Sequence, residues 1–569
     1  MISRRRFLQS STFATASSAL ALPQGAGAAD PTAQSPGRKP RHIIHMVADG
    51  MSMGTLTCAD HLSQLLRRGR GLTWVSLLQN PAVSGAWVNM RSLNSLVTDS
   101  AAASSSWGSG SRVINGAINQ LPTGKNLKTL YELFAGIGWK RGLVTTTEVT
   151  HATPAGFAAN VDDRDTGARI ATQYLERKVD LLLGGGQKFF DPKVRKDRRD
   201  LRAEFRLAGY RVMETKEELL TAPLDRRWLG IFDKSHLPFT VDHVNDSSLL
   251  ATVPTLAEMT NAALWRLEQH EHFILQVEGG RVDQACHNCD AVSALRDQIA
   301  FDEAIDVVLA FQRRVPDTLV VITTDHGNGN LGLNGMGTAY TQSSFLFDNV
   351  RDVKMSFPRM LERVRTIERI KLEDGKSTVD PGKDAPLAME DDPEGPEERR
   401  DDDVVDDDNN PDEEEKPEES PREARRRRRG KTRERITVAS TREIMEIIQA
   451  ATGYKVSARR VEMLIPFLAK KGKAMYDLMN SETAQLGQLM GNYLGIGWTG
   501  HSHTADYVPL SALGPGAQLF RGFMQNTDLF RHYLALVGID FRNPSEPLVA
   551  EQDLPPPVGV ENVEEYKLA

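Results

Sequence analysis

Residues 42–50 read HIIHMVADG, a run typical of a buried strand that ends in an aspartate and a glycine. Four later runs are also β-branched or leucine-rich, at 142–147, 179–183, 273–277 and 318–323. Amphipathic helical patterns lie between them, including 254–268, which begins with a proline suited to a first turn, and 290–314, with Asp290 as N-cap. This alternation predicts an α/β three-layer sandwich with a central, mostly parallel sheet covered by helices on both faces.

One segment departs from this pattern. From about 391 to 435 the chain has almost no large apolar residue and carries blocks of Asp, Glu and Arg. Such a composition cannot bury enough apolar surface to offset the entropy of ordering, so we expect a disordered charged insertion at 390–435. The alternative is a polyanion- or surface-binding arm built on the arginine run at 425–429.

The insertion would divide the catalytic domain into a first part at 30–389 and a second part at 436–550. Helical patterns resume in the second part at 441–451 and 456–480. A mobile tail is expected at 551–569. The chain of 569 residues is long enough for this single large domain, or for two or three smaller ones.

The N-terminus has the features of a targeting segment. Ser3-Arg4-Arg5-Arg6-Phe7-Leu8 resembles a twin-arginine export signal, and a weakly apolar stretch and small residues follow it. We therefore expect 1–29 to be an export signal and the mature protein to be periplasmic or secreted, with no membrane span after signal removal. The net charge of −7 disfavours a dedicated nucleic-acid binder.

Polar side chains suited to metal ligation follow four of the predicted strands. They are Asp49 after the first, Glu148 and His151 after the second, Glu278, Asp283 and His287 after 273–277, and Asp325 and His326 after 318–323. The carboxyl ends of parallel strands meet at one edge of a sheet, where ligand sites of open α/β folds form. Aspartate and histidine without thiolates are typical of a catalytic zinc site.

A nucleophile candidate lies in the stretch Val97-Thr98-Asp99-Ser100-Ala101-Ala102-Ala103, where a helix of small residues begins. A helix N-terminus favours an alkoxide and an incoming phosphate, and a zinc ion would lower the pKa of the Ser100 hydroxyl. The alternative is that Asp99 or Ser100 only caps the helix. The expected metal cluster nearby favours the nucleophile.

Together these motifs resemble the alkaline phosphatase family. The matching elements are Asp49-Gly50-Met51, Thr98-Asp99-Ser100-Ala101-Ala102, Ala152-Thr153-Pro154-Ala155 with Arg164, Val277-Glu278-Gly279 with Asp283 and His287, Thr324-Asp325-His326, and His503-Thr504 followed by Gly514-Pro515. Their order and spacing agree from about residue 41 to 520. The resemblance implies hydrolysis of phosphate monoesters through a phosphoserine, with two Zn²⁺ and one Mg²⁺ per chain. Relatives are often homodimers, so a homodimer is compatible with it.

The resemblance also implies roles for individual residues. One zinc is expected on Asp283, His287 and His503, with His501 as an alternative to His503. The second zinc is expected on Asp49, Asp325 and His326, and the magnesium on Asp49, Thr153 and Glu278. Arg164 is expected to bind two phosphate oxygens as a planar fork. Two metal ions about 4 Å apart can stabilise the entering and leaving oxygens together.

Two positions depart from the best-known bacterial pattern. His151 stands where an aspartate is often found beside the third metal, and Gln284 stands where a lysine often contacts phosphate through water. Asp99, His151 and Gln284 are therefore expected around the metal ligands, and for His151 an additional contact to the third site is the alternative. Cys286 and Cys289 flank His287 as Cys-x-x-Cys, for which a redox or zinc-thiolate role is an alternative to a structural one. His42, His45, His61, His236 and His243 are expected to be structural or surface residues.

Two other functions are compatible with parts of the pattern. A phosphodiesterase or sulfatase-like enzyme could use the same two-zinc core, although Arg164 complements an unesterified phosphoryl group and so favours monoesters. A non-catalytic phosphate- or polyanion-binding protein would not need Ser100 together with a full metal set.

Overall fold

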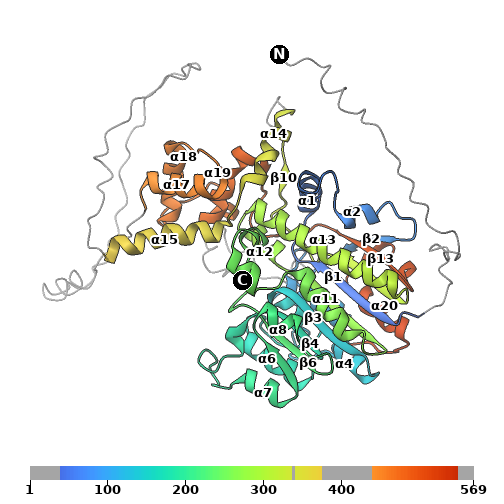
Figure 1. Ribbon diagram of the computed structural model, residues 1–569. Coiled ribbons are helices and arrows are strands. Elements are labelled where there is room, and N and C mark those ends of the chain that lie inside the picture. Colours follow the sequence, from blue (N-terminus) through green and yellow to red (C-terminus); the bar gives the residue numbers. More distant parts are fainter. Residues whose placement is uncertain (1–38, 336–339, 374–438, 549–569) are drawn as a thin grey trace, which may run out of the picture.

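The computed structural model describes residues 39–335, 340–373 and 439–548 (Figure 1). The predicted export signal at 1–29, the charged insertion at 390–435 and the tail at 551–569 lie outside the described residues. In the part of the chain that is described, no helix combines the length and the apolar character needed to cross a membrane.

A ten-stranded sheet forms the centre of the protein. Its strands, in spatial order, are β14 (Gly522–Gln525), β2 (Ser84–Asn89), β13 (Val508–Leu513), β8 (Thr318–Thr323), β1 (His42–Ala48), β7 (Phe273–Gly279), β3 (Lys140–Glu148), β4 (Leu181–Gly185), β6 (Arg227–Ile231) and β5 (Tyr210–Met213). Strand β13 is antiparallel to both of its neighbours, and the other pairings are parallel. The predicted mostly parallel sheet is therefore confirmed.

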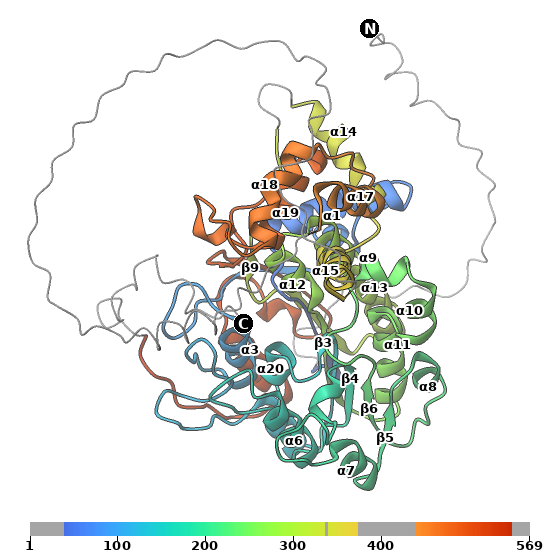
Figure 2. The ribbon, with the colours of Figure 1, turned by 90° about the vertical axis from the view of Figure 1, so that its left-hand side faces the viewer.

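Strand β1 is buried along its whole length because helices cover both faces of the sheet. Ile44 and Met46 pack in a cluster with α1 (Met53–Leu66), α11 (Leu256–Leu267) and α13 (Ala291–Arg314). Ile43 and Val47 point the other way, into a cluster with α3 (Ser100–Ser109), α4 (Leu130–Gly136), α6 (Gly167–Glu176) and α20 (Asp528–Val537). Figure 2 shows α3 and α20 on one side of the sheet and α11 and α13 on the other, which gives the three predicted layers.

Smaller helices complete the two outer layers. They are α2 (Thr73–Leu77), α5 (Ala152–Ala155), α7 (Leu201–Leu207), α8 (Lys216–Leu220), α9 (Thr240–Val244), α10 (Ser247–Thr252) and α12 (Arg281–His287). A separate group, α14 (Gln342–Asp348), α15 (Phe357–Glu373), α17 (Thr441–Thr452), α18 (Ala458–Leu468) and α19 (Glu482–Leu494), lies beside the sheet (Figure 1). We call α15 and α17–α19 the helical unit.

Two helix predictions need correction. Pro254 does not open α11, because Thr255 is the N-cap and forms a capping box with Glu258. Residues 456–480 are not one helix: α18 ends at Leu468, and Lys470 follows with a φ of 54°. A left-handed residue of this kind ends a helix. Asp290 does cap α13 as predicted, accepting a hydrogen bond from the backbone N–H of Ser293.

Two short strand pairs connect the late part of the chain to the end of β8. β9 (Gly327–Asn328) pairs with β12 (His503–Thr504), so that His503 lies opposite Asn328. β10 (Gly332–Leu333) pairs with β11 (Ile496–Gly497), directly after α19. His503, which follows Asp325 by almost two hundred residues in the sequence, therefore lies at the same edge of the sheet.

Candidate active site

Strands β8, β1, β7 and β3 are neighbours, and the predicted ligands gather at their carboxyl ends. Among the described residues, three groups of side chains have ligand atoms within 4.8 Å of one another, namely Asp283 with His287 and His503, Asp49 with Asp325 and His326, and Asp49 with His151 and Glu278. The turn after β1 permits this closeness. Gly50 has a φ of +69°, and a Cβ there would lie 2.3 Å from a carboxylate oxygen of Asp283.

In the first group, two imidazole nitrogens face each other beside a carboxylate. The Nε2 atoms of His287 and His503 are 3.0 Å apart, and they lie 3.3 and 3.5 Å from the two carboxylate oxygens of Asp283. Asn328 donates to Asp283 at 2.7 Å and fixes the orientation of that carboxylate. His501 contributes its carbonyl oxygen, which accepts from Nδ1 of His287 at 2.7 Å. His503, and not His501, therefore presents a ring nitrogen to this group.

In the second group, the nucleophile candidate meets a histidine and an aspartate. The hydroxyl oxygen of Ser100 is 3.1 Å from Nε2 of His326 and 3.5 Å from Oδ1 of Asp49. His326 Nε2 also lies 3.2 Å from a carboxylate oxygen of Asp325. The other oxygen of Asp325 accepts the backbone N–H of Gly50 at 3.0 Å, which links the ends of β8 and β1.

Asp49 is shared between the second and third groups because its two oxygens point in different directions. Oδ2 accepts from the Thr153 hydroxyl at 3.1 Å and lies 3.8 Å from Nδ1 of His151. The same nitrogen lies 3.8 Å from Oε1 of Glu278. The second Glu278 oxygen accepts from the hydroxyls of Thr145 and Thr147. Nδ1 of His151 thus faces the third group.

The three histidines of the first two groups have a fixed tautomer. Nδ1 points at a carbonyl oxygen in each, that of His501 for His287, Thr98 for His503 and Gly327 for His326. A carbonyl only accepts, so Nδ1 carries the proton and Nε2 presents a lone pair to the cluster. Lone pairs and carboxylates that face one another in this way are suited to hold a cation between them.

Burial and charge act strongly on these groups. Burial and the facing carboxylates of Asp325, Asp283 and Glu278 hold the pKa of Asp49 well above its ordinary value. Burial alone would lower the pKa of His326, but the Asp325 carboxylate outweighs it and the pKa is raised. Asp283 raises the pKa of His287 in the same way, against the effect of burial. Four buried carboxylates at one point are compatible with multivalent cations.

Helix α3 places Ser100 at its first position, as predicted. Asp99 is the N-cap, and its side chain accepts from the backbone N–H of Ala102 at 2.8 Å. Arg164 donates to the other Asp99 oxygen at 3.0 Å and to Nε2 of His151 at 3.3 Å. The interpretation of Asp99 as a cap and that of Ser100 as nucleophile are therefore both compatible with the structure.

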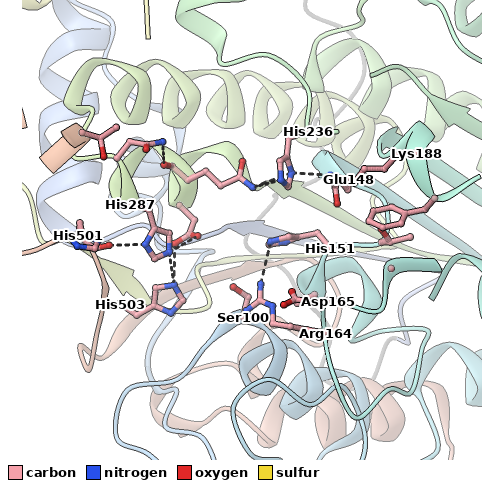
Figure 3. A pocket seen from close by; sticks show the side chains of 18 of the residues that line it. Ser100, Glu148, His151, Arg164, Asp165, Lys188, His236, His287, His501 and His503 are labelled. Carbon is pink, nitrogen blue, oxygen red and sulfur yellow. Dashed lines mark hydrogen bonds and ion pairs between the residues drawn. The ribbon is translucent and has the colours of Figure 1, made fainter. Parts of the chain in front are cut away.

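A cavity of about 770 Å³ opens over Ser100, Arg164 and His151. In Figure 3, His287, His501 and His503 lie on one side of this cavity, and His236, Glu148 and Lys188 lie on the other. Gln284 lines it too, and its side-chain nitrogen lies 3.1 Å from Nδ1 of His236. The Glu148 carboxylate forms an ion pair with Lys188 and accepts a hydrogen bond from the Ser235 hydroxyl, so Glu148 lies outside the three groups.

His236 belongs to this cavity although the sequence places it among structural or surface residues. Its Nδ1 accepts the backbone N–H of Glu148 at 3.2 Å, and burial lowers its pKa to about 2. No local motif marks this histidine, because its partners are 48 and 88 residues away. Asn328 was missed as well, although its place two residues after Asp325-His326 was a usable signal.

Cys286 and Cys289 are buried free thiols that enter different clusters. Burial raises the pKa of Cys289 to about 12 and that of Cys286 well above its ordinary value. Protonated thiols of this kind are poor nucleophiles and poor metal ligands. The geometry favours the structural interpretation of both cysteines.

Comparison with known proteins identifies the family. The sequence profile described as Alkaline phosphatase matches residues 40–405. The chain is 28% identical to alkaline phosphatase 4 of Bacillus subtilis over 76% of this chain and 75% of that protein. It is 36% identical to alkaline phosphatase 3 of the same organism over 42% of this chain and 51% of that protein. The crystal structure of Thermus thermophilus alkaline phosphatase superposes with a TM-score of 0.72 and 30% identity, covering 93% of this chain and 98% of that one. The chain therefore belongs to the alkaline phosphatase family and is a phosphoric monoester hydrolase.

Proposed function

We propose that this enzyme hydrolyses phosphate monoesters through a phosphoserine at Ser100, in a site that holds two zinc ions and one magnesium ion. The observation that carries the proposal is the position of the Ser100 hydroxyl. It lies at the start of α3, 3.1 Å from Nε2 of His326 and 3.5 Å from Oδ1 of Asp49, in the cavity that also exposes Arg164.

The first two groups fit zinc by their chemistry. Two nitrogens bound to one tetrahedral zinc lie about 3.3 Å apart, and the Nε2 atoms of His287 and His503 are 3.0 Å apart. Asp49, Asp325 and His326 offer the same combination of imidazole and carboxylate. Both groups contain only nitrogen and oxygen donors, as is typical of catalytic zinc.

The third group fits magnesium, with oxygen donors from Asp49, Thr153 and Glu278. Oε1 of Glu278 and Nδ1 of His151 are buried, and neither has a hydrogen-bond partner among the described residues. Nε2 of His151 accepts from Arg164, an obligate donor, so Nδ1 carries a proton in this arrangement. His151 therefore lies beside the third ion and does not ligate it.

When bound, such ions supply positive charge at the entering and leaving oxygens of the phosphoryl group and at the water of the second step. The chain itself provides the nucleophile and its orientation. The Ser100 hydroxyl loses its proton and its oxygen bonds to phosphorus, while the bond from phosphorus to the ester oxygen breaks and that oxygen takes up a proton as the alcohol leaves. Water then attacks the phosphoserine, which releases inorganic phosphate and restores the hydroxyl.

Arg164 and the N-terminus of α3 bind the phosphoryl oxygens during both steps. The Arg164 guanidinium is a planar fork suited to two oxygens, and Asp99 keeps it oriented toward Ser100. Backbone N–H groups at the start of α3 add a positive potential at the same place. With one unesterified oxygen facing the ligand groups, a monoester still offers two oxygens to this fork and a diester offers only one, so the fork favours monoesters.

The test compares p-nitrophenyl phosphate with bis(p-nitrophenyl) phosphate. We expect kcat/KM to be at least 100-fold higher for the monoester, and Arg164→Ala to reduce that ratio. A faster diester reaction in the wild-type enzyme would contradict the monoester assignment and favour a phosphodiesterase with the same core.

We also propose a homodimer formed through an apolar patch at the β14–β2–β13 edge. Trp87, Tyr507 and Phe523 are exposed by 47%, 56% and 56%, and with Met53 they line a hollow of about 600 Å³. A second copy of the chain would cover the same patch by two-fold symmetry. Light scattering after gel filtration should give twice the chain mass, and Phe523→Glu should give the monomer.

Export through the twin-arginine pathway is proposed from Arg4 and Arg5, which lie outside the described residues. Replacing both with lysine should leave the protein in the cytoplasm of its host, whereas the wild-type chain should be found in the periplasm or the medium. An unchanged distribution would reject this pathway.

A further inference from the structure

The cavity over Ser100 has two chemically different sides. Lys188 and His236 lie on one side, with the Phe189 ring under Lys188, and His501 lies on the other (Figure 3). Asn288, Ser481 and Thr483 also line the cavity and form a second set with His501. The second set adjoins the first ligand group at two points. Asn288 follows His287 directly in the sequence, and the carbonyl oxygen of His501 accepts a hydrogen bond from Nδ1 of His287. We call these four residues the neutral wall.

The neutral wall faces the position of the departing alcohol. In an in-line displacement the leaving oxygen lies opposite the attacking one. Ser100 contacts His326 and Asp49 of the second group, so the leaving oxygen points toward His287 and His503 of the first group. The alcohol attached to it can then extend along Asn288, Ser481 and Thr483, which line the same cavity.

Packing holds the neutral wall in place through Cys289. The thiol donates to the carbonyl of Gly500 at 3.5 Å, next to His501. Its side chain clusters with Met479 and Ala484, which flank the Ser481–Thr483 turn. A Cβ at Gly487 of α19 would lie 2.6 Å from the Cβ of Cys289, so the helix fits closely against this point. The end of α12, the start of α19 and the His501 segment are thereby fixed together.

The groups on this wall both donate and accept hydrogen bonds and carry no net charge. Ser481 and Thr483 offer hydroxyls, and Asn288 offers an amide whose Nδ2 already donates to the carbonyl of Gln284. The neighbouring Glu482 carboxylate forms an ion pair with Arg365 of α15 and does not line the cavity. The aromatic ring of Phe189 is on the opposite side.

We infer that the enzyme is built for phosphate esters of neutral polyhydroxylated alcohols, such as sugar or polyol phosphates, whose hydroxyls bind Ser481, Thr483 and Asn288. This inference rests on the proposed function, because it presumes phosphoryl transfer to Ser100. The helical unit, through the start of α19, thereby determines which alcohol is preferred.

The test is Thr483→Val, which replaces the hydroxyl with a methyl group of the same shape. Substrates are a hexose 6-phosphate and phenyl phosphate, and inorganic phosphate serves as a competitive inhibitor without an alcohol. We expect kcat/KM for the hexose 6-phosphate to fall roughly 3- to 10-fold, the loss typical of one hydrogen bond. The value for phenyl phosphate should change less than twofold, and the inhibition constant of phosphate should not change.

Ser481→Gly is the second variant, because glycine removes the hydroxyl while remaining an acceptable N-cap. It should show the same selective loss. Thr441→Val is the matched control: it lies in the first turn of α17 in the same helical unit, away from the cavity. It should leave both substrates unaffected.

Equal losses for both substrates in Thr483→Val and Ser481→Gly, or no loss for either, would overturn the inference. In that case phenyl phosphate would still be hydrolysed and the proposed function would stand. Failure of the proposed function would look different: no ester would be turned over, or turnover would persist in Ser100→Ala.

Discussion

Asp99 holds Arg164 by a direct ion pair, with 3.0 Å between Oδ2 of the carboxylate and Nη1 of the guanidinium. The same oxygen accepts the backbone N–H of Gly116 at 2.9 Å, and Oδ1 caps α3 through Ala102 at 2.8 Å. One carboxylate therefore fixes both the helix that begins at Ser100 and the arginine that we propose binds phosphate.

Loss of this carboxylate should weaken the binding of phosphate. In Asp99→Ala, Arg164 loses its fixed orientation. Little repulsion between Asp99 and phosphate is relieved, because Arg164 and two backbone N–H donors already compensate the charge of the carboxylate. We expect the inhibition constant of inorganic phosphate to rise 3- to 10-fold. Loss of the helix cap should lower the free energy of unfolding by about 1 kcal/mol. Asp99→Asn keeps a capping oxygen and should lose less stability. Tighter phosphate binding in Asp99→Ala would mean that Asp99 acts mainly by repulsion.

Ser100→Ala should abolish turnover without disturbing the ligand groups. The hydroxyl is the only part removed, and it is the proposed attacking atom, so we expect kcat to fall by at least about 10³-fold. Ser106→Ala is the matched control, since the Ser106 hydroxyl donates only within its own helix, to the carbonyl of Ala103. Turnover of p-nitrophenyl phosphate and metal content per chain should be measured together. Wild-type activity in Ser100→Ala would reject Ser100 as nucleophile.

His151→Asp should increase the affinity for magnesium. Nδ1 of His151 lies 3.8 Å from oxygens of both Asp49 and Glu278, so an aspartate there would add an oxygen donor, which magnesium prefers. The Mg²⁺ concentration for half-maximal activity should fall at least about threefold. His61→Asp, on the exposed side of α1, is the control. An unchanged magnesium requirement would place His151 outside the influence of the third ion.

The sheet and the position of its site could be predicted because they depend on local patterns. Strands β1 and β8 have the predicted bounds, since continuous apolar runs in a parallel sheet have few alternatives. The start of α3 at Ser100 was also predictable, because Asp99 followed by small residues is a cap signal. Ligands at successive strand ends then follow from the topology.

The walls of the cavity could not be predicted, because they depend on contacts between distant segments. His236 reaches Gln284 only through the fold. Ser481 lines the same cavity as His287 because Cys289 packs against α19. The interpretation of 456–480 as one helix was wrong for a local reason: apolar residues continue after Leu468, but the backbone turns at Lys470.

Removal of metal should destabilise the fold. Asp49, Asp283, Asp325 and Glu278 are buried together, so without cations their charges repel one another. An ion at a concentration 1,000 times its dissociation constant adds about 4 kcal/mol to the free energy of unfolding. A chelator should therefore lower Tm by at least about 5 °C. Zinc with magnesium should restore it, in Ser100→Ala as in the wild type, since the serine is not needed to hold the ions. An unchanged Tm in the chelator would argue against buried cations.

Asp297 should make stability depend on pH. It is buried in α13 and accepts from the backbone N–H and the hydroxyl of Thr240 at 3.1 and 2.9 Å. Burial raises its pKa to about 7, although Arg281 opposes the shift; Asp242 adds to it. The side-chain carboxyl of an aspartate in an unfolded chain has a pKa of about 3.9. Between these two values the unfolded chain gives up its proton while the folded chain keeps it, so the free energy of unfolding falls as pH rises.

Asp297→Asn removes this ionisation and keeps one oxygen to accept from Thr240. The variant should therefore gain stability relative to the wild type as pH rises from 5 to 8, by about 2 kcal/mol. The midpoint of urea unfolding at pH 5, 6.5 and 8 measures the trend. Asp162→Asn is the control, because that carboxylate is exposed and its pKa is lowered, chiefly by a hydrogen bond from Arg169. A difference between Asp297→Asn and the wild type that stays constant with pH would show that Asp297 is already ionised in the folded protein at pH 5.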